Sequence, residues 1–283
     1  MKNIERMAKI ISFLNFKGGV GKTTTTVNVA KALHDMDFRV LVIDADPQGN
    51  ASKLMGKRID EGNDCTLYQL MMGAKKVEEC RFLEQDKDDS FEFIPSNHDL
   101  GNVEWQLSNQ MGREGILKKA IRPILDDYDF ILIDCSPIDG VVTHNAVTAS
   151  DYIIVPLNGE PFAVDGMGRI LQRYRETKET VNEKIQILGY VFNLIKKCGL
   201  HEDTKRTLRE QHAKRNWPGK IFNTEIKQNV KISETSGKYT NIFDFMNTFS
   251  KSNFLSRNKW ESANSAAEQY KQLAAEIVES ING

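Results

Sequence analysis

The sequence predicts a doubly wound α/β fold, a mostly parallel sheet with helices on both faces. Short apolar, β-branched runs recur along the chain, and helix-length segments separate them. Those runs are almost continuously apolar rather than alternating, which is typical of strands covered on both faces. Alternation of strands and helices at this spacing indicates parallel strands joined by crossover helices. The length of 283 residues fits one large domain over residues 1–283, with two small domains as the alternative.

The expected elements begin with a strand at residues 10–16, followed by a glycine-rich turn and a helix at 23–36. The later strand candidates are the apolar runs at 39–43, 91–94, 130–133, 152–155 and 187–192, with 221–226 a weaker candidate. The later helix candidates are the segments at 113–126, 140–149, 164–181 and 202–215. A final helix at about 261–281 carries an apolar stripe and has glutamates on its polar face. Because a membrane-surface helix favours a lysine-rich polar face, we expect this helix to pack against its own sheet.

The composition argues against several classes of protein. Basic and acidic residues nearly balance, at 38 against 39, so any binding to a polyanion must come from local clusters. The first apolar run is short and lacks a cleavage site of small residues, which argues against a signal peptide. No apolar stretch approaches the roughly 20 residues that cross a bilayer, so we expect a cytoplasmic protein. Cys65, Cys80, Cys135 and Cys198 are widely spaced with no CxxC pair, which predicts four reduced thiols.

The stretch "NFKGGVGKTTTT" at residues 15–26 predicts a phosphate-binding loop between a strand and a helix. Gly18, Gly19 and Gly21 have no Cβ, so the chain can curl until successive backbone N–H groups surround phosphate oxygens. The start of the following helix adds the positive end of its dipole. Lys22 can bridge the β- and γ-phosphates, and the Thr23 hydroxyl can bind Mg²⁺. A turn that only connects strand and helix is the alternative, and it has no need for Lys-Thr at this offset.

Lys17 departs from the usual phosphate-loop pattern, which has glycine five residues before Gly21 where this chain has Phe16. Directed into its own site, the Lys17 side chain would duplicate Lys22. Directed outward, it could reach the phosphates of a neighbouring subunit. The expected nucleotide contacts of the loop are Lys17, Gly18, Gly19, Val20, Gly21, Lys22, Thr23 and Thr24.

Polar residues follow or end three of the expected strands, at Asn15, Asp44 and Asp134. Parallel sheets bind ligands at the carboxyl ends of their strands, so we expect these residues to meet in one crevice. Aspartates also end strands and cap loops for purely structural reasons. Because the phosphate loop follows an adjacent strand, we favour a role for Asp44 and Asp134 near the bound metal ion over this purely structural alternative.

The loop sequence "KGGVGKTT" resembles the deviant P-loop of the ParA/MinD ATPases. Four later segments resemble ParA proteins as well: "VLVIDADPQGNAS" from residue 40, "DFILIDCSP" from residue 129, "IIVPLNGEPFAVDGM" from residue 153 and "GYVFN" from residue 189, with "EIKQNVKISE" from residue 225 a weaker match. The resemblance extends over about residues 8–195. It departs from the family pattern after Pro137, where Ile138 replaces the second of two prolines.

The resemblance implies an ATP hydrolase that forms a homodimer bridged by ATP, with Mg²⁺ at the site. It implies that Lys17, Lys22 and Asp46 act in catalysis, with Lys17 contacting the nucleotide of the opposite subunit and Asp46 positioning the attacking water. The residues expected on the metal side are Thr23, Asp44 and Asp134. Asn193 lies where the family often recognises the adenine base.

A basic segment indicates what such an ATPase could act on. Residues 196–231 contain ten Lys or Arg against four acids, a difference of plus six in a chain whose net charge is −1. Lys205, Arg206 and Arg209 share one helix face, which could hold DNA phosphates without recognising bases. A solvated helix face is the alternative. The expected DNA contacts are Lys205, Arg206, Arg209, Lys214, Arg215, Lys227, Lys231, Arg257 and Lys259.

The resemblance therefore implies a ParA-type partition ATPase that binds DNA non-specifically, associates with the nucleoid and segregates a plasmid or chromosome. The residues before Ile10 leave no room for a helix-turn-helix domain, so sequence-specific recognition would fall to a ParB-like partner that stimulates hydrolysis. A MinD-like membrane-surface ATPase and a ParA-like ATPase that positions a protein cargo are the alternatives. A relative of dethiobiotin synthetase would need an acceptor site that the sequence does not show. A relative of the nitrogenase iron protein would need cluster-binding cysteines at other spacings.

Overall fold

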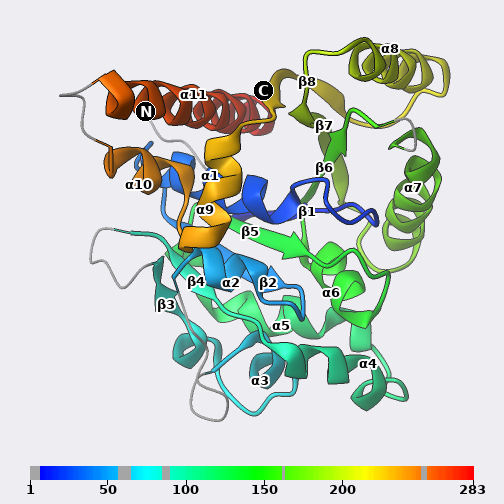
Figure 1. Cartoon of the computed structure of the whole chain (residues 1–283). Coiled ribbons are helices and arrows are strands. Elements are labelled where there is room, and N and C mark those ends of the chain that lie inside the picture. Colours follow the sequence, from blue (N-terminus) through cyan, green and yellow to red (C-terminus); the bar gives the residue numbers. More distant parts are fainter. Residues whose placement is uncertain (1–6, 57–64, 85–89, 161–162, 250–253) are drawn as a thin grey trace.

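A computed structural model describes residues 7–56, 65–84, 90–160, 163–249 and 254–283. Within these ranges the strands form a single eight-stranded sheet in the order β3-β4-β2-β5-β1-β6-β7-β8 (Figure 1). The strands are β1 (Lys9–Phe13), β2 (Val40–Ala45), β3 (Phe82–Leu83), β4 (Glu92–Ile94), β5 (Phe130–Cys135), β6 (Tyr152–Asn158), β7 (Gln186–Ile195) and β8 (Lys220–Lys227). All neighbouring strands are parallel except β3 and β4. The predicted fold class is confirmed.

Helices lie on both faces of the sheet, with α1, α9, α10 and α11 on one side and α3, α4, α5 and α6 on the other (Figure 1). The helices are α1 (Lys22–His34), α2 (Asn50–Leu54), α3 (Leu67–Met71), α4 (Val103–Gln106), α5 (Ile116–Ile121), α6 (Val141–Ala149), α7 (Ala163–Thr180), α8 (Gly199–Lys214), α9 (Val230–Lys238), α10 (Ile242–Asn247) and α11 (Phe254–Asn282). Short 3₁₀ helices lie at Val77–Cys80, His98–Asn102, Arg113–Gly115 and Arg122–Asp127.

Alternate residues of the central strands face two separate apolar cores. In β2, Leu41 and Ile43 pack into the core under α3, α5 and α6, whereas Val40 and Val42 pack into the core under α1 and α11. Because successive side chains of a strand point to opposite faces, both sets must be apolar when helices cover both faces. This arrangement explains the continuous apolar runs in the sequence.

The structure departs from the expected elements where local signals were weak or conflicting. The expected helix at 113–126 is divided into α5 and two flanking 3₁₀ helices, and Pro123 lies in the second of these. Proline lacks the backbone donor that an α-helix interior needs, which limits α5 at that end. Strand β3 and the short helices α2, α3, α4, α9 and α10 were not predicted.

Helix α11 packs against its own sheet, as predicted. Tyr270, Leu273 and Ile277 on its apolar stripe are buried in the core that it shares with α1. Its polar side chains also protect the edge strand β8, because Glu276 accepts a hydrogen bond from the Asn223 N–H at 3.1 Å and Gln269 accepts one from the Lys227 N–H at 2.7 Å. An edge strand satisfied in this way presents fewer open backbone groups to other chains. None of the helices in the described ranges has the length and apolarity needed to cross a membrane.

The cysteine prediction is wrong for one pair. Cys65 and Cys80 form a disulfide, with their Cα atoms 4.7 Å apart, and both residues are buried. They lie 15 residues apart in sequence, and the turn of chain through α3 brings them together, which spacing alone does not reveal. Cys135 is a free, buried thiol and Cys198 is a free, exposed one.

Candidate nucleotide site

The phosphate loop connects the end of β1 to the start of α1. Gly19 and Gly21 have φ values of 73° and 82°, a left-handed conformation that glycine adopts without steric cost. A Cβ at Gly21 would also overlap the side-chain amide of Asn193. Helix α1 begins at Lys22, directly after the loop, so its N-terminal backbone donors and its dipole are available to a bound anion.

A cavity of about 520 Å³ lies over this loop. It is lined by Gly18, Gly19, Gly21, Lys22, Thr23, Thr24, Asp46, Gln48, Asn50, Lys53, Leu54, Pro137 and Tyr239. Asp44 and Asp134 are register partners on the neighbouring strands β2 and β5, and Phe13 of β1 pairs with Asp134 on its other side. The carboxyl ends of these three strands therefore meet at the loop, as predicted.

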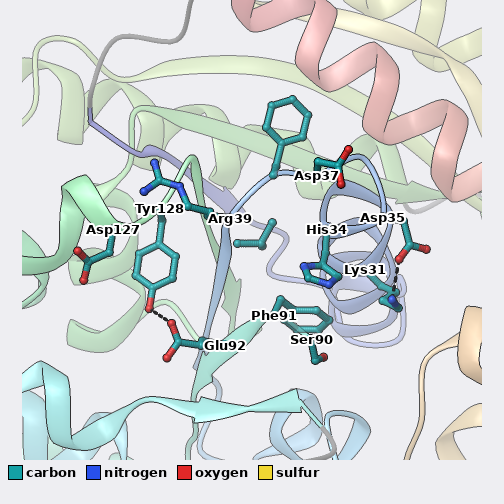
Figure 2. A pocket seen from close by; sticks show the side chains of 12 residues that line it. Lys31, His34, Asp35, Asp37, Arg39, Ser90, Phe91, Glu92, Asp127 and Tyr128 are labelled. Carbon is teal, nitrogen blue, oxygen red and sulfur yellow. Dashed lines mark hydrogen bonds and ion pairs between the residues drawn. The ribbon is translucent and has the colours of Figure 1, made fainter. Parts of the chain in front are cut away.

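A second cavity, of about 590 Å³, lies at the amino end of β2 rather than at its carboxyl end (Figure 2). Several of the charged and polar groups that line it are bonded to one another. Tyr128 donates to the Glu92 carboxylate at 2.5 Å, and the Lys31 ammonium donates to Asp35 at 2.6 Å. No glycine-rich loop lines this cavity, so the phosphate-binding chemistry belongs to the first.

Lys22 extends from the first residue of α1 and is only 7% exposed. Its ammonium donates to the Lys17 carbonyl oxygen at 3.3 Å, so it is directed back over the loop. Burial lowers the pKa of Lys22, while the negative charge of Asp134 acts in the opposite direction. A triphosphate in the cavity would supply the negative charge that favours the protonated form.

Unlike Lys22, the Lys17 side chain is directed away from the loop and forms an ion pair with Glu160. Its ammonium donates to the Glu160 carboxylate at 2.5 Å, and the two side chains are 30% and 55% exposed. Glu160 belongs to the segment that follows β6, and its pKa is lowered by the hydrogen bond and the charge of Lys17. The second lysine of the loop is thus held at the loop entrance and does not duplicate Lys22.

Asp44 fixes the start of the segment that contains Asp46. Its carboxylate accepts hydrogen bonds from the Asp46 N–H at 3.2 Å, the Ser52 N–H at 2.8 Å and the Ser52 hydroxyl at 2.7 Å. Complete burial raises the pKa of Asp44 to about 6, although the bonds from Ser52 favour its ionised form. Asp46 is 8% exposed, lines the cavity and accepts a bond from the Gln48 N–H at 3.0 Å.

Asp134 carries the clearest signal for a metal ion. Neither of its two buried carboxylate oxygens has a hydrogen-bond partner at normal distance and angle in the described part of the chain, although the nearby Thr23 hydroxyl and the charge of Lys22 favour its ionised form. Burial, followed by the charge of Asp44, raises the pKa of Asp134 well above its usual value. A buried carboxylate without partners is costly unless a cation or proton compensates it. Thr23 and Asp134 are therefore the residues that would hold Mg²⁺, and the ion would compensate the buried charge of Asp134.

The described residues contain no cluster of three His, Cys, Asp or Glu side chains arranged to hold a metal ion. Mg²⁺ usually retains several waters and binds through one or two protein groups plus substrate phosphates. The ion would therefore depend on the nucleotide for much of its coordination. Asp44, whose oxygens are bonded to Ser52 and Asp46, would act through its neighbours rather than as a direct ligand.

Asn193, expected at the adenine base, lies beneath the phosphate loop and is 1% exposed. Its amide nitrogen donates to the Val20 carbonyl at 2.9 Å, the Gly21 carbonyl at 3.3 Å and the Thr25 hydroxyl at 2.9 Å. The structure thus brings Asn193 to the site, at the back of the loop.

The prediction that Lys205 lies on an exposed DNA-binding face is wrong. Its side chain is 6% exposed and its ammonium lies 2.8 Å from Glu225 and 2.9 Å from Glu202. Glu225 belongs to β8, so Lys205 faces the sheet, where a buried ammonium needs a carboxylate partner. Lys205 is not available to DNA phosphates.

The other basic residues of the predicted DNA surface remain accessible to different degrees. Arg206, Arg209, Lys231 and Arg257 form ion pairs with Asp203, Glu225, Glu234 and Glu261, respectively. Lys214, Arg215, Lys227 and Lys259 are exposed. Lys214 and Arg215 end α8, which lies at the margin of the molecule (Figure 1).

Several residues at the site were not predicted, among them Glu160, Lys53 and Tyr239. Glu160 is part of a segment that resembled ParA proteins, but nothing local indicates that it meets Lys17. Lys53 lines the cavity from α2 and donates to the Gln48 carbonyl at 2.8 Å. Tyr239 lines it from the end of α9, more than 200 residues from the loop in sequence, and is half-exposed. Contacts at such separation have no local sequence signal.

A glycine-rich phosphate loop followed by Lys-Thr, beside strand-end carboxylates on a parallel sheet, defines a P-loop ATPase. A family model described as an AAA domain matches residues 8–187. The chain is 32% identical over 275 residues to the chromosome-partitioning ATPase Soj of Treponema pallidum, covering 96% of this chain and 98% of that protein. It is 32% identical over 243 residues to the sporulation initiation inhibitor protein Soj of Bacillus subtilis, covering 84% and 92%. The chain belongs to the family of ParA/MinD-like ATPases.

Solved structures agree with this assignment. Cobyrinic acid a,c-diamide synthase of Mycobacterium smegmatis, with bound ADP and magnesium, superposes with a TM-score of 0.72 at 27% identity, covering 82% of this chain and 91% of that one. The cell division ATPase MinD of Pyrococcus furiosus gives a TM-score of 0.68 at 22% identity, covering 96% and 99%, and shows the shared fold. The protein is an ATP hydrolase that uses ATP and Mg²⁺.

Proposed function

We propose that this protein is a ParA-type partition ATPase that forms an ATP-bridged dimer and segregates a plasmid or chromosome. The observation that carries the proposal is Lys17, a second lysine held by Glu160 at the loop entrance, apart from the position of Lys22. From there its ammonium can exchange Glu160 for the phosphates of a second protomer. The near full-length similarity to a chromosome-partitioning ATPase supports the same function.

The proposed dimer binds DNA non-specifically through exposed basic residues, including Lys214 and Arg215 at the end of α8 and Lys227 at the end of β8. Phosphate contacts of this kind provide affinity without base recognition. Dimerisation joins two such surfaces, and linked sites bind with an affinity that can exceed either alone by about a hundredfold. A ParB-like partner then stimulates hydrolysis and releases the dimer, which gives the protein its nucleoid association.

The alternative of a MinD-like membrane-surface ATPase is less well supported. A membrane-surface helix needs an apolar face that is free to enter the lipid. The apolar stripe of α11, by contrast, is buried against the sheet and α1. We therefore propose that the basic surface binds DNA rather than a membrane.

The test is binding of a fluorescent non-specific duplex with ATP, with ADP and without nucleotide, at two salt concentrations. We expect ATP-dependent binding that weakens steeply with salt. Replacing both Lys214 and Arg215 with alanine should weaken binding about tenfold and lower the salt slope by up to about two, since each lost phosphate contact removes about 0.9. The matched control replaces Lys118 and Lys119, an exposed pair on α5, with alanine. DNA binding that is equally strong with and without ATP would contradict DNA partitioning and favour a protein cargo. The same conclusion would follow if the control variant lost as much DNA affinity as the Lys214 and Arg215 variant.

A further inference from the structure

We infer that an apolar pocket beside the nucleotide cavity docks an aliphatic side chain from a basic segment of a partner protein, and that this contact stimulates ATP hydrolysis. The pocket has a volume of about 300 Å³ and lies among α4, α6 and the segment that follows β5. Leu100, Ile138 and Val142 provide much of its apolar lining. The inference rests on the proposed stimulation by a partner, but it does not depend on DNA binding.

Two segments of the chain separate this pocket from the nucleotide cavity, and neighbouring residues of each segment line different cavities. In the first segment, Asp46 lines the nucleotide cavity, whereas Pro47 lines the apolar pocket. In the second, Pro137 lines the nucleotide cavity, whereas Ser136 and Ile138 line the apolar pocket. A side chain in the apolar pocket therefore contacts both segments on the side that faces away from the nucleotide.

Hydrogen bonds limit how far each segment can move without its neighbours. Asp46 and Pro47 belong to a turn that is closed by a bond from the Gly49 N–H to the Asp46 carbonyl oxygen at 2.9 Å. In the second segment, the Ile138 N–H donates to the Ser136 hydroxyl at 3.2 Å. Contact with Pro47 and Ile138 can therefore favour one arrangement of both segments, and so fix the position of Asp46 at the nucleotide.

The charge at the pocket indicates the chemistry of the partner. Glu104 of α4 lines the pocket and is exposed. It accepts a bond from the Val141 N–H at 2.7 Å, and it forms no ion pair within the described ranges. Asp139 also lines the pocket, and its charge is already paired with Arg173. The uncompensated carboxylate of Glu104 is therefore complementary to a lysine or arginine next to the aliphatic side chain of the partner.

The size and surroundings of the pocket favour a protein as the partner. Its volume is at the lower end of the range of about 300–1,000 Å³ for ligand pockets, which suits a side chain better than a large cofactor. Ile138 is 66% exposed, and Trp105, which follows Glu104 in α4, is 80% exposed. Exposed apolar side chains beside a pocket are typical of protein interaction sites. We therefore expect the partner to cover Trp105 while its aliphatic side chain enters the pocket.

The first test fills the pocket from within the chain. Gly101 lines the pocket, and a Cβ there would meet no atom within 4 Å, so a larger side chain has room. We expect Gly101→Leu to raise ATP turnover at least about threefold without any partner, because the added side chain takes the place of the partner's. The matched control is Gly115→Leu. Gly115 also belongs to a 3₁₀ helix and also has no atom within 4 Å of an added Cβ, but it does not line the pocket.

The second test uses N-acetyl-leucyl-lysine amide as a probe, with NMR of isoleucine and valine methyl groups. We expect this dipeptide to shift the methyl signals of Ile138 and Val142 in the parent protein but not in Gly101→Leu, whose pocket is filled. N-acetyl-seryl-lysine amide, which lacks the aliphatic side chain, should cause no shift. Glu104→Gln keeps an acceptor for the Val141 N–H but removes the charge, so it should weaken dipeptide binding by up to about fivefold.

Unchanged or lower turnover in Gly101→Leu, or an equal rise in Gly115→Leu, overturns the inference. If Gly101→Leu does not fold, the parent protein decides, and a dipeptide that leaves Ile138 and Val142 unshifted overturns it. Weaker dimerisation of Gly101→Leu without any dipeptide shift also overturns it, because a second copy of the chain would then occupy the pocket. DNA binding of Gly101→Leu is measured alongside. If it still depends on ATP, the partition function stands even where the pocket fails.

Discussion

The ammonium of Lys17 lies 2.5 Å from the carboxylate of Glu160, so the unusual lysine of the phosphate loop is bonded to the segment that follows β6. Both side chains are partly exposed, at 30% and 55%. Exposed ion pairs contribute at most about 1 kcal/mol, because solvent screens the attraction. A triphosphate carries more negative charge than one carboxylate and can compete for Lys17. The pair therefore holds Lys17 at the loop entrance but permits its transfer to a second protomer.

Substitution of Lys17 tests this transfer. We expect Lys17→Ala to remain monomeric with a non-hydrolysable ATP analogue, as measured by sedimentation velocity, while still binding the analogue within about threefold of the parent protein, because Lys22 and the loop backbone remain. Glu160→Gln should dimerise at up to about fivefold lower protein concentration, because it removes the competing carboxylate. A Lys17→Ala protein that dimerises like the parent would rule out the cross-subunit role.

Asp46 should be needed for hydrolysis but not for binding. It lines the cavity, and its position is fixed by Asp44, which accepts a bond from the Asp46 N–H. We expect Asp46→Ala to lose at least about a hundredfold in turnover, the usual contribution of a group that positions or activates water. Its ATP affinity, measured by calorimetry, should stay within a few-fold of the parent. A variant with near-normal turnover would show that another residue orients the water.

Lys205 should matter for stability rather than for DNA. Removing it leaves Glu225 with Arg209 as a partner but without its buried ammonium neighbour. We expect Lys205→Ala to lower the free energy of unfolding by about 1–3 kcal/mol, as for other broken charge-assisted bonds. Arg206→Ala, which breaks an exposed pair with Asp203, should change it by less than about 1 kcal/mol. Urea denaturation measures both, and a loss of DNA affinity confined to Lys205→Ala would refute this assignment.

The features that were predictable from sequence are those with a local signal. Strand β5 was found because helices cover both of its faces and its first four residues, at 130–133, are all apolar. The loop was found because glycines and Lys-Thr must lie at fixed offsets to surround phosphates. By contrast, the inward direction of Lys205 depends on Glu225 of another element, and the position of Asn193 depends on Val20, 173 residues away. Such pairs are set by sheet order, which spacing along one chain does not determine.

The segment after Asp134 is tied to α7 through Asp139, and this connection gives a pH-dependent prediction. The Asp139 carboxylate lies 3.0 Å from both Arg173 and His144 and 3.3 Å from Arg169. Burial opposes ionisation of Asp139, but the hydrogen bonds and charges of Arg173 and His144 together outweigh it, so the pKa of Asp139 is lowered. The Arg169 guanidinium also lies 4.9 Å above the Phe16 ring, which connects α7 to the loop entrance.

A carboxylate with a lowered pKa in the folded state stabilises the protein above its unfolded pKa, and that contribution disappears as the pH falls through the folded value. At pH 7 we expect Asp139→Asn to lower the free energy of unfolding by about 1–3 kcal/mol, because it removes a charge-assisted bond. Below about pH 4 the parent loses the same interaction by protonation, so the difference between parent and variant should shrink. Urea denaturation across this range measures the difference, with Arg175→Ala, an exposed change on the same helix, as the control. A difference that stays constant from pH 7 to about pH 3 would mean that Asp139 acts through its shape rather than its charge.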